Sequence, residues 1–124
     1  MALRVKRVME LAIVILADTE SHGDLGRLAN GLESASDAAA HGAAVEVIFD
    51  GAATRWLPLL AKAGHKYHAR LEELRPQVIA CAYCARAFGV HEEIASLGIK
   101  LADDSRGHPS LYQRLSRGVK VLTF

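Results

Sequence analysis

The sequence predicts a single α/β domain with a mostly parallel five-stranded sheet and helices on both faces. Three observations predict it. The 124-residue chain contains five short apolar runs, a segment with helical features separates each run from the next, and the first run is apolar throughout. Continuous apolar runs are typical of strands covered on both faces, and parallel neighbours need the crossover that such helices supply.

The first half of the chain contains two of the predicted strands. Residues 11–17 form the first strand and residues 43–51 the second. Between them we expect a helix from Leu25, because apolar residues recur at intervals of three and four. These residues are Leu28, Leu32, Ala35 and Ala39. Gly42 then ends the helix as a glycine C-cap.

The second half of the chain continues the alternation. The remaining strands are predicted at residues 77–82, 99–103 and 119–124. The helical segments are predicted at residues 53–64, 66–76, 83–98 and 108–118. Pro58 fits the first turn of its helix, Gly89 breaks the third segment in two, and Ser110 with Gln113 has the spacing of a capping box.

Composition and charge exclude several classes of protein. Apolar residues make up 51% of the chain and charged residues 23%, as in an ordinary globular domain, and a net charge of +1 gives no reason to expect a nucleic-acid partner. The basic residues Arg4, Lys6 and Arg7 imitate a secretory signal, but Glu10 interrupts the apolar run. Residues 11–17 are too short to span a bilayer. We therefore expect a cytoplasmic domain of residues 1–124 with no membrane segment.

Functional groups of open α/β sheets collect just past the carboxyl ends of the strands. Here that rule places polar and sulfur-containing side chains from four strand ends on one rim. They are Asp18, Thr19, Glu20, Ser21, His22, Asp50, Arg55, Trp56, Cys81, Tyr83, Cys84, Asp103, Asp104, Arg106 and His108. This rim is the candidate functional site.

The two cysteines of the chain, Cys81 and Cys84, lie together in "VIACAYCARAFGV" at the end of the third predicted strand. We expect Cys81 at the N-terminus of the next helix, within reach of solvent, where the helix lowers the thiol pKa from about 8.5. Such a thiolate is a nucleophile, and Cys84 on the same helix face is placed to resolve a disulfide or persulfide. Alternatively, both thiols fill a helix–sheet seam as small hydrophobic groups.

The cysteine segment resembles that of the DsrE/DsrF-like sulfur-relay family, in a small C-x-x-C variant. In that family a cysteine ends a central strand and a glycine–hydrophobic pair follows eight residues later, as Cys81 and Gly89–Val90 do here. Residues 15–35 and 45–57 also look like the family's first two strand–helix units. Nearly the whole chain is covered, although only the cysteine segment is specific.

The resemblance implies a flavodoxin-like three-layer fold and assembly into homo- or hetero-oligomers, often trimers or hexamers. It also implies that Cys81 carries sulfur as a persulfide between donor and acceptor proteins. Cys84 is absent from the single-cysteine members of the family. Its presence here adds a reversible Cys81–Cys84 disulfide to the chemistry we expect.

Four histidines are candidates either for an alternative zinc site or for side chains that assist the thiols. His65 and His68 precede the C-x-x-C by a spacing that a zinc site allows, although we favour two solvated side chains. His22 either lies over the thiols and tunes their ionisation or is a helix-start residue near solvent. His108 either lies near the cysteines on the rim or is a turn residue before Pro109. The glycines of "SHGDLG" open a helix, but they lack a nucleotide-binding fingerprint. We expect no cofactor and no bound metal.

Two functions remain open from the sequence. The first is a thiol protein that handles sulfur as a persulfide carrier or sulfurtransferase, or exchanges disulfides, with Cys81 reacting, Cys84 resolving, and His22 or His108 assisting. The second is a non-catalytic oligomeric module whose cysteines pack or hold zinc. The solvent accessibility and the pKa values of the two cysteine thiols distinguish these functions.

Overall fold

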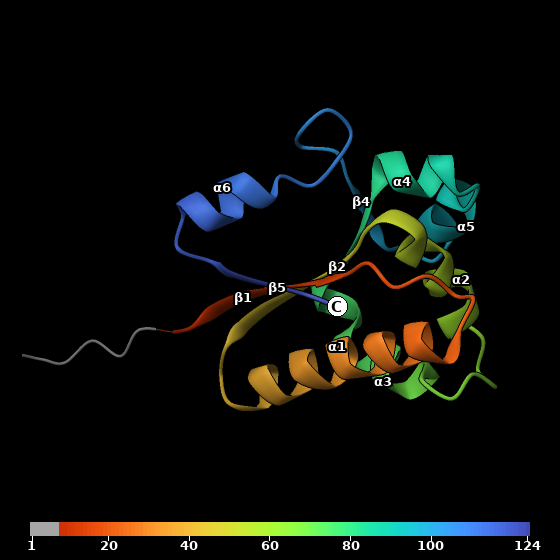
Figure 1. Cartoon of the computed structure of the whole chain (residues 1–124), viewed down its shortest axis with the longest axis horizontal. Helices are drawn as coiled ribbons and strands as arrows, with labels where there is room; N and C mark the ends of the chain where they lie inside the picture. The colour runs from red at the N-terminus through yellow and green to blue at the C-terminus, as the bar shows by residue number, and fades with distance from the viewer. Residues whose placement is uncertain (1–7) are drawn as a thin grey trace, which may run out of the picture.

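The computed structural model describes residues 8–124, and it confirms the predicted α/β fold; Arg4, Lys6 and Arg7 lie outside the described residues. Five strands form one sheet in the order β4-β3-β2-β1-β5, and every neighbouring pair is parallel (Figure 1). The strands are β1 (Glu10–Ile15), β2 (Ala44–Phe49), β3 (Val78–Cys81), β4 (Lys100–Ala102) and β5 (Lys120–Thr123). Their carboxyl ends therefore meet at one edge of the sheet.

Helices cover both faces of this sheet, which gives the three layers of a flavodoxin-like arrangement. The helices are α1 (His22–Ala40), α2 (Trp56–Leu60), α3 (His68–Leu74), α4 (Ala82–Ala87), α5 (His91–Ser96) and α6 (Leu111–Ser116). Two short 3₁₀ helices, η1 (Gly51–Arg55) and η2 (Arg75–Gln77), precede α2 and β3. Figure 1 shows α1 and α3 on one side of the sheet and α6 on the other.

The two faces of the sheet bury different side chains because successive strand residues point to opposite sides. Ile13 and Phe49 belong to the larger core, which the apolar faces of α1, α2 and α3 complete. Val14 and Ile48 belong to the smaller core, against which Leu111 of α6 packs. The connection from β4 through α6 to β5 thus crosses the second face and places β5 beside β1.

The boundaries of the first helix differ from the prediction. Helix α1 begins at His22 rather than near Leu25, because the Ser21 hydroxyl oxygen accepts a hydrogen bond from the Asp24 amide at 3.1 Å. Such a side-chain cap satisfies an amide that has no partner inside the helix. Gly42 follows the helix with φ of +86°, as expected for a glycine that ends a helix.

The segment after β2 also departs from the prediction of one helix over residues 53–64. It forms η1 and then α2, with Pro58 inside the single helical turn of α2. The Asp50 carboxylate accepts a hydrogen bond from the Gly51 amide at 2.8 Å and so caps η1. Among residues 8–124, every helix is too short or too polar to span a bilayer.

Candidate functional site

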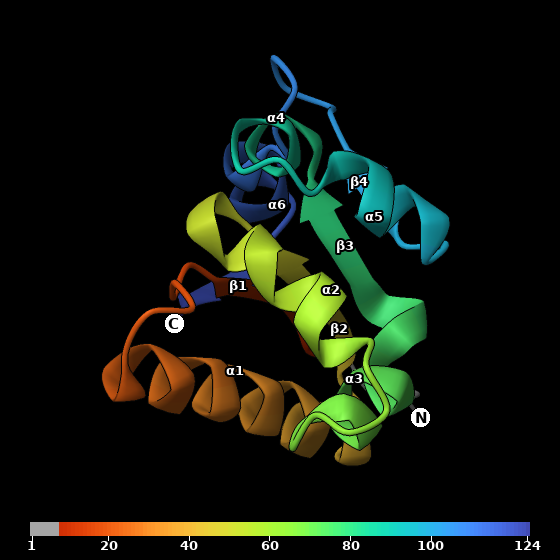
Figure 2. The same ribbon diagram turned by 90° about the vertical axis from the view of Figure 1, so that its right-hand side faces the viewer.

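Cys81 is the last residue of β3 and the residue that caps α4, as the sequence predicted. Its sulfur accepts a hydrogen bond from the Cys84 amide at 3.4 Å. Figure 2 shows β3 running directly into α4 at the carboxyl edge of the sheet. The strand–helix junction therefore fixes Cys81 and brings the thiol of Cys84 to the same face of the first helical turn.

His108 reaches the same thiol from the loop between β4 and α6. Its Nδ1 atom lies 3.2 Å from the Cys81 sulfur. The loop is held in place by a hydrogen bond from the Tyr83 amide to the Gly107 carbonyl at 2.8 Å, and the rings of Tyr83 and His108 stack with centroids 4.6 Å apart. A thiol and an imidazole in this arrangement can exchange a proton directly.

Gly107 is needed for this contact. Its φ of +86° is a conformation that residues with a side chain rarely adopt, and a Cβ atom there would lie 3.3 Å from Cβ of Tyr83. Asp104 anchors the other end of the same loop, because its carboxylate accepts a hydrogen bond from the Ser110 amide at 2.9 Å. That hydrogen bond holds the pKa of Asp104 below its ordinary value.

Asp50 completes the site from the end of β2. The Cys84 thiol donates to its Oδ1 atom at 3.4 Å, and this carboxylate also accepts from Gly51. One donor atom from each of Asp50, Cys81, Cys84 and His108 lies within 4.8 Å of all the others. We call these four residues the thiol cluster. The sequence placed all four on the rim but gave Asp50 no role.

Burial corrects two expectations about Cys81. The residue is 0% exposed, so the expectation that its thiol lies within reach of solvent is wrong. Burial raises the pKa of the Cys81 thiol to about 12, and the nearby Asp50 carboxylate acts in the same direction. The expected lowering of the pKa is therefore wrong as well, because desolvation of the thiolate outweighs the hydrogen bond from the start of α4.

Cys84 is the more accessible of the two thiols. It is half-buried, whereas Cys81 is buried. Burial also raises the pKa of the Cys84 thiol, and the carboxylate of Asp50 adds to the effect. Of the two thiols, a reagent from solvent therefore meets that of Cys84 first.

The other predicted histidines lie outside the thiol cluster. His22 is exposed at the start of α1 and lines a shallow surface hollow with Trp56 and His65. His65 accepts a hydrogen bond from the Tyr67 amide, and Nδ1 of His68 lies 2.8 Å from the Leu60 carbonyl oxygen. The structure therefore does not bring His22, His65 or His68 to the thiols.

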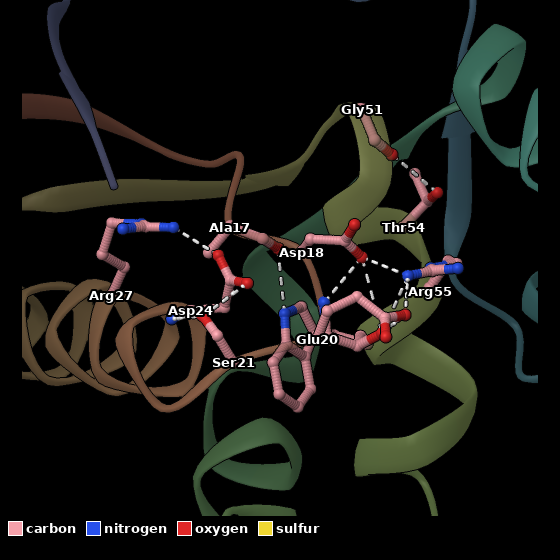
Figure 3. A network of polar contacts seen from close by, with 11 residues as sticks. Ala17, Asp18, Glu20, Ser21, Asp24, Arg27, Gly51, Thr54 and Arg55 are labelled. Atoms are coloured by element: carbon pink, nitrogen blue, oxygen red, sulfur yellow. Dashed lines mark hydrogen bonds and ion pairs between the residues drawn. The ribbon is translucent and has the colours of Figure 1, made fainter.

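A second group of rim residues forms an ion-pair network. Arg55 contacts the carboxylates of Asp18 and Glu20 and the hydroxyl of Thr19 (Figure 3). The hydrogen bond from the Thr19 amide is the main cause that holds the pKa of Asp18 below its ordinary value, and Arg55 adds to it. Trp56 is buried beneath the network, where its indole N–H donates to the Ala17 carbonyl at 3.0 Å. These contacts tie η1 to the end of β1.

Comparisons with known proteins identify relatives of the chain but no activity. No protein-family model matches it. The chain is 32% identical over 78 residues to an uncharacterized protein of Methanocaldococcus jannaschii, an alignment that spans 63% of this chain and 64% of that protein. A solved structure of a conserved protein of unknown function from Bacteroides thetaiotaomicron matches with a TM-score of 0.61 and 20% identity, over 91% of this chain and 94% of that one. The structural match shows a shared fold.

Proposed function

We propose that the protein is a small thiol protein that handles sulfur, as a persulfide carrier or sulfurtransferase, or that exchanges disulfides, through Cys84 and Cys81. The observation that carries the proposal is the contact of 3.2 Å between the Cys81 sulfur and Nδ1 of His108, with the Cys84 thiol in the same cluster. A thiol that only fills space needs no proton acceptor at this distance. The resemblance to the DsrE/DsrF-like family supports sulfur chemistry at this strand end, but it implies Cys81 as the carrier, and the proposal reverses the roles of the two cysteines.

The burial of Cys81 determines the order in which the two thiols react. Half-buried Cys84 attacks the outer sulfur of a donor persulfide, the S–S bond of the donor breaks, and the donor leaves as a thiol that takes the proton of Cys84. Cys84 then carries the sulfur as a persulfide. An acceptor thiol that attacks the outer sulfur removes it and regenerates the Cys84 thiol, so this branch involves no net oxidation.

The second branch uses Cys81 and His108. The Cys81 thiol passes its proton to Nδ1 of His108, and the thiolate attacks the inner sulfur of the Cys84 persulfide. A Cys81–Cys84 disulfide forms while hydrosulfide leaves and takes the proton back from His108. The two cysteine sulfurs lose two electrons, which the released sulfur gains. A dithiol reductant then returns both cysteines to thiols.

Mass spectrometry of three proteins tests the proposal, each reduced, freed of metal by a chelator and treated with one equivalent of a sulfane-sulfur donor. We expect Cys81→Ser to gain about 32 Da on Cys84, the mass of one persulfide sulfur, and to keep it. Wild type should instead lose about 2 Da through disulfide formation and release sulfide. Cys84→Ser should acquire neither change at a comparable rate.

Other outcomes would contradict the proposal. If wild type and both variants stay unmodified while the urea-unfolded chain reacts, the cysteines are packing residues. If Cys84→Ser gains sulfur on Cys81 as fast as wild type reacts, the order of the thiols is wrong. Two further expectations are part of the same proposal: the cytoplasmic location expected from the sequence, and the homo-oligomer with donor and acceptor proteins as partners that the family resemblance implies.

A further inference from the structure

The thiol cluster offers the donor atoms of a zinc site. It provides two cysteine sulfurs, one imidazole nitrogen and one carboxylate oxygen, all within 4.8 Å of one another. Thiolate, imidazole and carboxylate are the three ligand types that bind zinc in proteins, almost always four together in structural sites. The donors come from three separate segments of the chain, so the fold and not a local motif assembles them.

Two distances inside the cluster are close to the edge lengths of a tetrahedral zinc shell. Zn–S bonds of about 2.3 Å and Zn–N or Zn–O bonds of about 2.0–2.2 Å place neighbouring ligand atoms about 3.3–3.8 Å apart. The Cys81 sulfur lies 3.2 Å from Nδ1 of His108, and the Cys84 sulfur lies 3.4 Å from Oδ1 of Asp50. The first distance is slightly shorter than this range and the second lies within it, while the remaining pairs are at most 4.8 Å apart. Side-chain movements of about 1 Å would therefore bring the four atoms to one tetrahedral shell.

The charges around the cluster also fit a cation. Within residues 8–124, the carboxylate of Asp50 contacts the Gly51 amide and the Cys84 thiol, and it forms no ion pair with a lysine or arginine. The nearby guanidinium of Arg55 is instead paired with Asp18 and Glu20. A half-buried carboxylate beside two thiols lacks the positive partner that buried charges ordinarily have.

We infer that Asp50, Cys81, Cys84 and His108 bind one Zn²⁺ ion as a closed four-ligand site. This site goes beyond the proposed sulfur chemistry and does not depend on it. Because both processes use the sulfur atoms of Cys81 and Cys84, a bound zinc ion prevents sulfur loading, and a persulfide or disulfide prevents zinc binding. Zinc release then becomes a condition for thiol reactivity.

Anaerobic titration of the reduced, metal-free chain with Co²⁺ tests the site. We expect one Co²⁺ per chain, with the intense visible bands of a tetrahedral ion and thiolate-to-cobalt charge-transfer absorption, and one equivalent of Zn²⁺ should displace it. Asp50→Asn, which keeps an oxygen to accept from Gly51, and His108→Ala should each weaken metal binding by at least about 100-fold. His65→Ala is the matched control and should bind as wild type does.

Several results would overturn the inference. These are Co²⁺ spectra without thiolate charge transfer, binding weakened as much by His65→Ala as by His108→Ala, or full affinity in Asp50→Asn. Far-UV circular dichroism of each metal-free variant confirms that it is folded. If the protein takes up sulfur but binds no metal, only the zinc site is refuted. If it binds metal but takes up no sulfur, only the proposed function is refuted.

Discussion

Replacing His108 with alanine is expected to slow closure of the Cys81–Cys84 disulfide by about 10²- to 10⁴-fold, the range that a positioned general base supplies. The reason is that the buried Cys81 thiol, whose pKa is raised to about 12, has Nδ1 of His108 beside it at 3.2 Å as a proton acceptor. The measurement is sulfide release after one equivalent of a sulfane donor is added to metal-free, reduced protein. His22→Ala is the matched control, because His22 lies outside the thiol cluster.

The pH profile separates a general base from a merely structural residue. A thiol with a raised pKa is protonated below that value, so without His108 the reacting thiolate comes only from direct ionisation. Closure in His108→Ala should then accelerate about tenfold for each pH unit between 7 and 10, because the thiolate fraction of a group with pKa of about 12 rises in that proportion. A variant as fast as wild type, or uniformly slower with the wild-type pH profile, would contradict the role of His108.

Replacing Phe49 with alanine is expected to lower the free energy of unfolding by about 3–5 kcal/mol, the usual cost of a large cavity in a core. Phe49 is 0% exposed and among the largest fully buried side chains in the described residues. It ends β2 immediately before Asp50, so its loss loosens the strand end that presents this carboxylate. Urea denaturation of wild type and variant measures the difference.

The matched control for Phe49 is an exposed aromatic residue. Tyr112 on α6 is 77% exposed, and Tyr112→Ala should change stability by less than about 0.5 kcal/mol. Phe49→Leu keeps most of the apolar volume and should fall between the two. A loss below about 1 kcal/mol in Phe49→Ala would mean that β2 is not packed as described.

The strand order along the chain was predictable because the sheet is buried. Residues 11–17 and 78–82 are continuous apolar runs, which mark buried strands in the sequence. β3 lies within the second run, and β1 overlaps the first but begins one residue earlier, at Glu10. The start of α1 was missed because it depends on Ser21 and Asp24, a cap that carries no apolar signal. The split into η1 and α2 was missed for a similar reason, since Asp50 caps η1 locally.

The candidate site was predictable in composition but not in geometry. The rule for strand ends placed Cys81, Cys84, His108 and Asp50 on one rim, and the structure brings these four together. The strand-end rule could not distinguish His108 from His22, because the loop that carries His108 is positioned by its tertiary contact with Tyr83. Burial of Cys81 is likewise a property of the packed molecule, and this is why a lowered pKa was expected.

The contact between Cys81 and His108 is the basis of the proposed function, and imidazole ¹⁵N NMR of the reduced, metal-free protein at neutral pH tests it most directly. Nδ1 of His108 should appear as an unprotonated nitrogen that accepts the thiol proton, with the ring proton on Nε2, and Cys81→Ala should change the His108 signals while those of His22 stay unchanged. His108 signals that are the same in wild type and Cys81→Ala would show that the two side chains do not meet.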